Sequence, residues 1–198
     1  MKKFEEKKFN IPELKGISKK TVEEHLKLYA GYVKHSNLIQ EHVVELGKDS
    51  EKYTYELGEI NRRFAFEFCG MKNHEYYFSA LESGAKNLSD KSELKKAIEK
   101  EWGSFDGWLA RFKAVALTRG IGWAMLSYDR QENRLITHWV DEQHLGQLAG
   151  TQLVLALDMW EHSFVADYQP SGKKDYINDF FENLNWSVVE KNYTEATK

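Results

Sequence analysis

The chain has 198 residues, a length that fits one domain or two small ones packed together and allows about 70% of the unfolded surface to be buried. Hydrophobic residues make up 41% and charged residues 30%, with a formal net charge of −3. This composition is typical of a globular protein and argues against a general nucleic-acid binder. Cys69 is the only cysteine, which excludes an intrachain disulfide and a multi-cysteine zinc site.

The first residues are basic, but no apolar run follows them, so the sequence predicts neither a secretory signal nor a membrane anchor there. No other segment approaches the ~20 consecutive apolar residues of a membrane-spanning helix. We therefore expect a cytoplasmic protein that has no membrane partner and no nucleic-acid partner.

Two long helices are predicted in the first half of the chain, where Pro12 is the only proline. The first extends from Ile17 to about Leu46, with Ser18 as its N-cap and Gly47 at its end. The second extends from Glu51 to about Leu81. Side chains at three- and four-residue spacing form one face of each helix: Val22, His25, Leu28, Tyr29 and Tyr32 in the first, and Phe64, Phe68, Met71, His74 and Phe78 in the second. A short polar turn between the helices predicts an antiparallel hairpin.

The second half of the chain mixes helices and strands. Asp90, with Glu93 as its capping-box partner, begins a third helix that ends near Gly103. Ser104 begins a fourth helix, which ends around Gly120. Three strands and two short helices follow, over Trp123–Tyr128, Arg134–Val140, Thr151–Asp158, Tyr176–Asn183 and Trp186–Lys191. The predicted class is α+β: an N-terminal antiparallel helical hairpin domain (residues 1–86), then an α/β domain (residues 87–198) with a three-stranded antiparallel sheet.

Four side chains form a candidate metal site. His25 and His74 lie on the apolar faces of the two long helices, so antiparallel packing would bring their imidazoles together. Asp158 ends an apolar strand, where an unpaired buried carboxylate is costly, and His162 follows four residues later. Three imidazoles and a carboxylate suit Fe, Mn or Zn, but spacing alone also allows four hydrogen-bonded core groups without a metal. We expect His35, His42 and His138 to face solvent, and His144 stays undecided.

The chain resembles the iron/manganese superoxide dismutase family over nearly its whole length. The segments that carry the resemblance are Ile17-Ser18, His25, Gly31-Tyr32-Val33, Asn73-His74, Trp102-Gly103-Ser104-Phe105, Gly120-Ile121-Gly122-Trp123-Ala124, Asp158-Met159-Trp160-Glu161-His162, Asp175-Tyr176 and Asn185-Trp186. The resemblance implies a homodimeric or homotetrameric superoxide dismutase with one Fe or Mn ion per subunit.

The resemblance also implies a role for each matching residue. His25, His74, Asp158 and His162 match the metal ligands, and Trp123 and Trp160 match the aromatic shell around the metal. Gln143 matches the glutamine that hydrogen-bonds the metal-bound solvent, and Gly70 matches the small residue that accompanies a glutamine from the sheet side. Tyr32 matches the gateway tyrosine of the substrate funnel. Glu161 matches the residue that reaches across the dimer interface to the partner's ligand histidine.

The chain departs from the family pattern near the funnel. The stretch from His25 to Tyr32 is one residue short, so Tyr29 or Tyr32 lines the funnel. The family's gateway histidine has no counterpart, since Leu28 or Tyr29 stands in its place, and Val165 replaces its tyrosine partner across the dimer. Losing both partners leaves neither one unsatisfied.

Several alternatives stay open on the sequence alone. His144 could take the role of Gln143. Gly70 with Gln143 favours manganese, whereas Ala156 and the missing gateway histidine weaken that choice. Local positive charge for an anionic substrate could come from Lys27, Lys173 and Lys174. A different non-haem metal oxidase or oxygenase, or an inactive metal-binding member of the same fold, is the alternative function.

Overall fold

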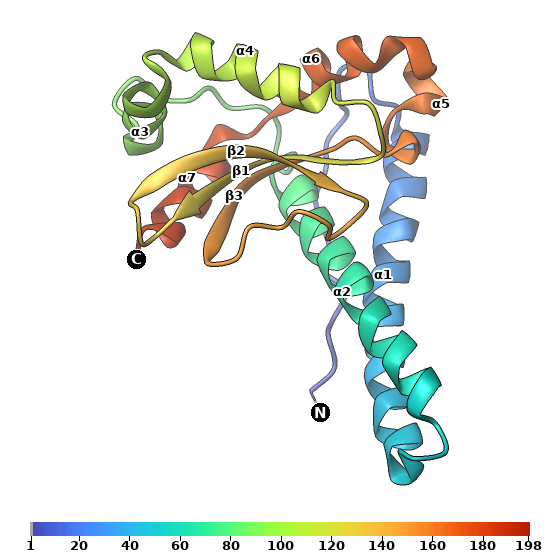
Figure 1. Cartoon of the computed structure of the whole chain (residues 1–198). Helices are drawn as coiled ribbons and strands as arrows, with labels where there is room; N and C mark the ends of the chain where they lie inside the picture. The colour runs from blue at the N-terminus through green and yellow to red at the C-terminus, as the bar shows by residue number, and fades with distance from the viewer. Residues whose placement is uncertain (1) are drawn as a thin grey trace.

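The computed structural model describes residues 2–198, and it has the predicted α+β architecture (Figure 1). A helical hairpin comes first, and an α/β part with a three-stranded sheet follows it. The elements are α1 (Lys19–Leu46), α2 (Thr54–Ser79), α3 (Glu93–Trp102), α4 (Phe105–Ala116), β1 (Gly122–Asp129), β2 (Arg134–Asp141), β3 (Thr151–Asp158), α5 (Val165–Tyr168), α6 (Lys173–Asn183) and α7 (Trp186–Ala196).

The hairpin of α1 and α2 is buried at one end only. Ser18 caps α1 as predicted, because its hydroxyl accepts a hydrogen bond from the backbone N–H of Thr21. The buried residues of α1 lie between Thr21 and Ser36, and those of α2 begin at Glu67. At their far ends, on either side of the turn that joins them, the two helices project from the rest of the molecule (Figure 1).

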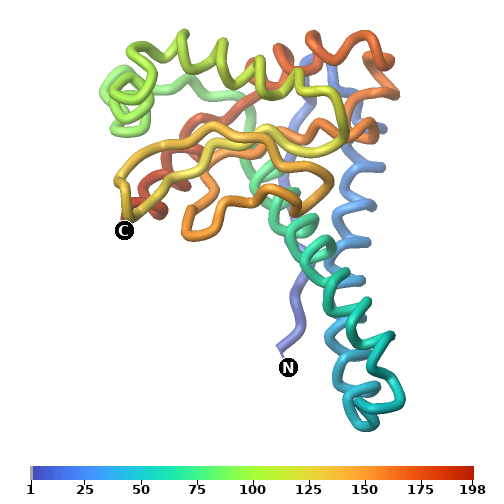
Figure 2. The backbone as a smooth tube through the Cα atoms, in the orientation of Figure 1, coloured from blue at the N-terminus to red at the C-terminus, as the bar shows by residue number. Residues whose placement is uncertain are grey.

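The N-terminal segment before α1 lies along the hairpin (Figure 2). The Asn37 side chain binds the backbone of Phe4 twice, as an acceptor at 2.8 Å and as a donor at 2.9 Å. Further along, the Phe9 ring packs between Tyr29 of α1 and Phe78 of α2, with ring centroids 5.6 and 5.4 Å away. This segment therefore covers the hairpin beside the residues that face the sheet.

The sheet has the order β2-β1-β3, and both pairings are antiparallel. α3 and α4 pack on β2, whereas α2 and α7 pack on β3. The indole N–H of Trp108 in α4 donates to the Thr137 hydroxyl of β2 at 3.1 Å, which ties the two layers together. Because β3 lies beside α2, the end of this strand meets the buried end of the hairpin.

Several details differ from the sequence prediction. The N-cap of α3 is Ser92, whose hydroxyl accepts from the backbone of Lys95, whereas the Asp90 carboxylate pairs with the Lys95 ammonium. Helix α4 ends at Ala116 and not around Gly120, since Leu117 already leaves helical geometry. Helix α5 was not predicted, because four residues are too few to show a helical period.

One expectation about a single side chain is wrong. His138 does not face solvent: it is half-buried, and its Nε2 lies 3.0 Å from the Ser127 hydroxyl on the neighbouring strand. Leu28, at the predicted spacing on α1, is 42% exposed. His35 and His42 are exposed as expected.

The division between residues 86 and 87 stays a prediction. At that point Lys86 exchanges backbone hydrogen bonds with Leu184 and Trp186, so the linker is held against the C-terminal segment.

Over residues 2–198, no helix has the combined length and apolarity that crossing a bilayer requires.

Candidate metal centre

Four elements bring one side chain each to a common point. His25 comes from α1, His74 from α2 and Asp158 from the end of β3. His162 lies in the short 3-10 helix Glu161–Ser163 that follows β3. The antiparallel hairpin places the two helical histidines side by side, with ring centroids 4.9 Å apart. The convergence thus depends on contacts between segments that are far apart in the chain.

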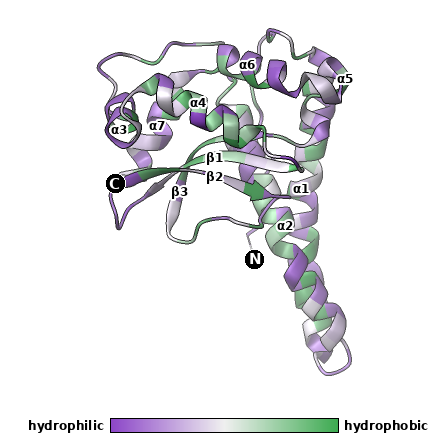
Figure 3. Ribbon diagram, turned by 45° about the horizontal axis from the view of Figure 1, so that its top comes forward, coloured by the Kyte–Doolittle hydropathy of each residue, from purple (hydrophilic) through white to green (hydrophobic). Residues whose placement is uncertain are grey.

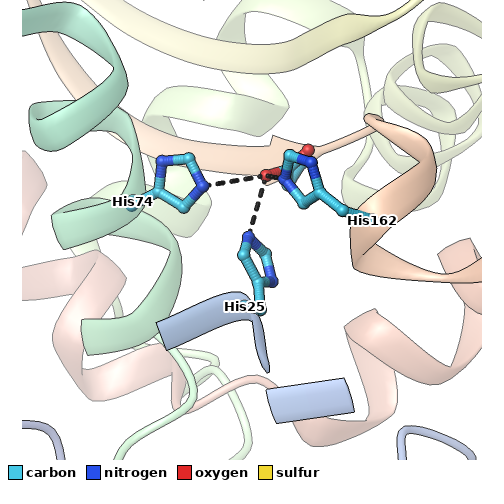
Figure 4. Close-up of side chains that lie close together, drawn as sticks. His25, His74 and His162 are labelled. Atoms are coloured by element: carbon cyan, nitrogen blue, oxygen red, sulfur yellow. Dashed lines mark hydrogen bonds and ion pairs between the residues drawn. The ribbon is translucent and has the colours of Figure 1, made fainter. Parts of the chain in front are cut away.

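The three imidazoles surround a single carboxylate oxygen (Figure 4). Oδ2 of Asp158 lies 3.1 Å from Nε2 of His25, 3.4 Å from Nε2 of His74 and 3.2 Å from Nε2 of His162. The four potential ligand atoms all lie within 4.8 Å of one another, and three of the four residues are fully buried. Only the His162 side chain, 22% exposed, reaches the surface.

The hydrogen bonds of His74 favour a metal over a set of satisfied core groups. Its Nδ1 lies 2.6 Å from the backbone carbonyl of Gly70, which can only accept, so Nδ1 carries the ring proton. Nε2 then holds a lone pair, and this buried atom has no hydrogen-bond partner among the described residues. A lone pair aimed at a carboxylate oxygen is unfavourable unless a cation lies between them, so the donor set fits a divalent metal.

The charge states also fit metal binding. Burial lowers the pKa of His74 to about 3 and lowers that of His25, so both rings are neutral at pH 7. Burial alone would raise the pKa of Asp158, but the neighbouring His162 and His25 outweigh it and hold that pKa well below its usual range. Neutral imidazoles and an ionised carboxylate are the forms that coordinate metals.

A second layer of hydrogen bonds lies beside the cluster. The Gln143 side chain is fully buried, and its oxygen accepts from the indole N–H of Trp123 at 2.9 Å. Its amide nitrogen donates to the Tyr32 hydroxyl at 2.9 Å. The Tyr32 ring lies 5.0 Å from that of His74, and Gly70 allows this approach, because a Cβ there would stand 2.6 Å from the Tyr32 ring.

The alternatives for these positions differ in their surroundings. The Tyr29 hydroxyl accepts from the backbone N–H of Lys7 at 2.9 Å, so it faces the N-terminal segment, whereas Tyr32 faces Gln143. His144 has no hydrogen bond to Tyr32 or Trp123 among the described residues, and its ring lies 5.8 Å from that of Phe66. The geometry therefore favours Tyr32 and Gln143 over Tyr29 and His144.

The remaining predicted residues surround this centre. Trp123 packs edge-on against His74 at 5.0 Å, and Trp160 stacks on His162 at 5.8 Å. Glu161 is exposed next to His162. Lys27 pairs with Glu24, and the Lys173 ammonium donates to the backbone carbonyl of Thr118, so both are already engaged.

Sequence reasoning missed two contributors. The Tyr176 hydroxyl donates to the backbone carbonyl of Asp158 at 2.9 Å and so fixes the end of β3. Phe66 packs against Tyr32, His144 and Trp160. Its position four residues before Gly70, one helical turn away, was the available signal.

This fold and cluster define a protein built around a candidate mononuclear metal centre. The sequence pattern of the iron/manganese superoxide dismutases, C-terminal domain, matches residues 90–192. An iron superoxide dismutase of Aquifex aeolicus is 33% identical over 191 residues, covering 93% of this chain and 88% of the relative. One of Cupriavidus metallidurans, also an iron enzyme, is 34% identical over 93% of this chain and 92% of the relative.

A manganese superoxide dismutase of Mycobacterium lepraemurium is 36% identical over 176 residues, covering 87% of this chain and 82% of the relative. The chain therefore belongs to the iron/manganese superoxide dismutase family. The relatives include both iron and manganese enzymes, so the resemblance leaves the metal open between the two.

Proposed function

We propose that this chain is a superoxide dismutase that uses one Fe or Mn ion held by His25, His74, Asp158 and His162. The observation that carries the proposal is the buried lone pair of His74 Nε2, which has no hydrogen-bond partner within residues 2–198 and is aimed at the Asp158 carboxylate. When bound, such an ion supplies alternate one-electron oxidation and reduction of superoxide, which yields dioxygen and hydrogen peroxide. Membership of the family supports the same reaction.

The surrounding residues exclude water and hold a proton. Trp123, Trp160 and Phe78 pack against the imidazoles and leave little room for solvent beside them. Burial, with the nearby charges of Asp158 and Glu67, raises the pKa of Tyr32, which keeps its hydroxyl protonated at neutral pH. Because that hydroxyl accepts a hydrogen bond from Gln143, its own hydrogen is free to be donated toward an anion. Formation of hydrogen peroxide consumes protons, so a protonated hydroxyl beside the cluster suits this reaction.

Metal analysis combined with a superoxide assay tests this function. We expect protein purified from its host to contain about one Fe or Mn per chain and to disproportionate superoxide in proportion to that content. Metal-loaded protein without this activity would favour the inactive metal-binding member, and dioxygen consumption with an organic substrate would favour an oxygenase.

We also propose a homodimer or homotetramer in the cytoplasm, with Glu161 next to the partner subunit's metal site. The exposure of Glu161 and the outward position of His162 support an interface at this point. Sedimentation at micromolar concentration tests the assembly: a monomer alone would remove the role of Glu161. Fractionation of host cells tests the compartment.

A further inference from the structure

A chain of aromatic rings connects the metal cluster with the surface of α2. The Tyr32 ring contacts His74, and the Trp160 ring contacts His162. Phe66 joins these two rings from outside, with centroids 6.0 Å from Tyr32 and 6.4 Å from Trp160. The rings of Tyr32, Phe66 and Trp160 are all half-buried. On this side of the cluster, these three rings lie between the metal ligands and solvent.

Arg63 lies over the outer ring of this chain. Its guanidinium carbon is 3.6 Å from the centroid of the Phe66 ring, and Arg63 precedes Phe66 by about one helical turn in α2. Its Nε donates to the carboxylate of Glu67 at 2.9 Å, and the Glu67 side chain is only 10% exposed. Two contacts therefore fix the guanidinium, whereas its two terminal nitrogens make no hydrogen bond to any described residue.

We propose that Arg63 supplies the local positive charge that draws the anionic substrate to the cluster between Tyr32, Phe66 and Trp160. The inference rests on the proposed function, because it takes superoxide as the anion. Arg63 is a positioning residue for the substrate, and the free terminal nitrogens of its guanidinium point to this use.

The charge balance of the chain favours a role for local positive charge. The formal net charge is −3, so the protein as a whole repels a small anion. Lys27 pairs with Glu24, Lys173 donates to a backbone carbonyl, and Lys174 is exposed. Within residues 2–198 none of these three lysines lies over the ring of Tyr32, Phe66 or Trp160, whereas Arg63 lies over Phe66. The Arg63 side chain is 48% exposed, whereas its partner Glu67 is 10% exposed, so the positive charge of the pair lies closer to solvent than the negative one.

The test compares Arg63→Gln with Arg62→Gln in metal-loaded protein. Both variants remove one arginine charge from the same turn of α2, but the Arg62 guanidinium is held by two hydrogen bonds to Glu59. Among the described residues it is Arg63, and not Arg62, that lies over the Phe66 ring. We expect Arg63→Gln to lower kcat/KM about two- to fivefold at low ionic strength and Arg62→Gln to leave it unchanged. The deficit should vanish near ~0.5 M salt, where charges are screened, and Arg63→Lys should recover most of it.

A second readout does not depend on turnover. The affinity of the metal-loaded protein for azide, a monovalent anion, is measured by optical titration, and Arg63→Gln should weaken it by a similar factor. A loss that is equal in both glutamine variants, or independent of salt, would overturn the proposal. So would a loss that follows dissociation of an oligomer. If wild-type protein does not disproportionate superoxide, the proposed function fails, while the azide affinities still test where the attracting charge lies.

Discussion

The two ends of the α1/α2 hairpin have the same secondary structure but very different surroundings. At the end that meets the sheet, His25, Tyr29 and His74 are buried between helices, strand and N-terminal segment. At the projecting end, Tyr55 is 84% exposed and Val44 is 56% exposed. Figure 3 shows hydrophilic and hydrophobic residues mixed at this end. Its ionic contacts include pairs within one helix, such as Glu59 with Arg62.

This difference separates two sources of helix stability. The projecting end depends on helix propensity, contacts between the two helices and exposed ion pairs worth about 0.3–0.5 kcal/mol each. The end at the sheet buries polar groups that oppose folding unless they are paired or ligated. We therefore expect substitutions at that end to change metal binding and turnover, and substitutions at the projecting end to change only stability, by small amounts.

The largest effect is expected for Asp158→Ala. All three imidazoles lie within 3.4 Å of this carboxylate, so its removal takes away both a ligand and the only anion among them. We expect loss of metal and of superoxide disproportionation together, and the same for His74→Ala, measured by metal analysis and assay. A metal-bound Asp158→Ala protein with full activity would contradict the ligand assignment.

Gln143→Ala should separate metal binding from turnover. The amide links Trp123 and Tyr32 without belonging to the four-residue cluster, so metal content should stay near normal. Loss of a second-layer partner of this kind typically costs about 10–100-fold in activity, and we expect a fall of that size. His144→Ala is the matched neighbour, and it should retain most turnover; the reverse ranking would assign the role to His144.

The sequence predicted those parts of the molecule that depend on local pattern. The long helices, the strand Thr151–Asp158 and the cap at Ser18 follow from spacing and capping chemistry, which act within a few residues. The candidate ligands were also named in advance, because a histidine on an apolar face and a carboxylate at the end of an apolar strand are costly without partners.

What the sequence could not supply depends on contacts between distant segments. Arg63 and Phe66 look like ordinary residues of a solvated helix until α2 is placed beside the loop that carries His144. The difference in surroundings between Tyr29 and Tyr32 depends on the N-terminal segment, since the backbone N–H of Lys7 donates to the Tyr29 hydroxyl. The capping error at Asp90 arose because Ser92, two residues later, competes for the same role with better geometry.

Acid should destabilise the metal-free protein through the buried end. The pKa of His74 is about 3 in the folded chain and about 6.5 when unfolded. Between these values the unfolded state binds the extra proton, so the free energy of unfolding falls as pH drops, by up to about 1.4 kcal/mol per pH unit. Urea denaturation of metal-free protein from pH 7 to pH 4 checks this, and unchanged stability would contradict burial of a neutral ring.

Gly70→Ala should disturb the centre without removing any ligand. The added Cβ would stand 2.6 Å from the Tyr32 ring, which must move and lengthen its hydrogen bond to Gln143. We expect a stability loss of about 1–3 kcal/mol from overpacking, with metal retained and turnover reduced. Chemical denaturation and assay of the same preparation check both parts; unchanged turnover would mean that the position of Tyr32 does not matter.

Gly58→Ala is the same substitution in the same helix, at the projecting end, and it should have the smallest effect and the opposite sign. Gly58 is exposed, and a Cβ built there meets no atom within 4 Å. Alanine lowers the conformational entropy of the unfolded chain and favours the helix, so the free energy of unfolding should rise by about 0.5–1 kcal/mol. Metal content and turnover should equal those of the wild type.

If the projecting end of the hairpin opens independently of the rest, the gain in stability will appear as slower amide hydrogen exchange around Gly58 and not in the global unfolding transition. Loss of turnover in this variant would show that the two ends of the hairpin are coupled, which the separation of their contacts argues against.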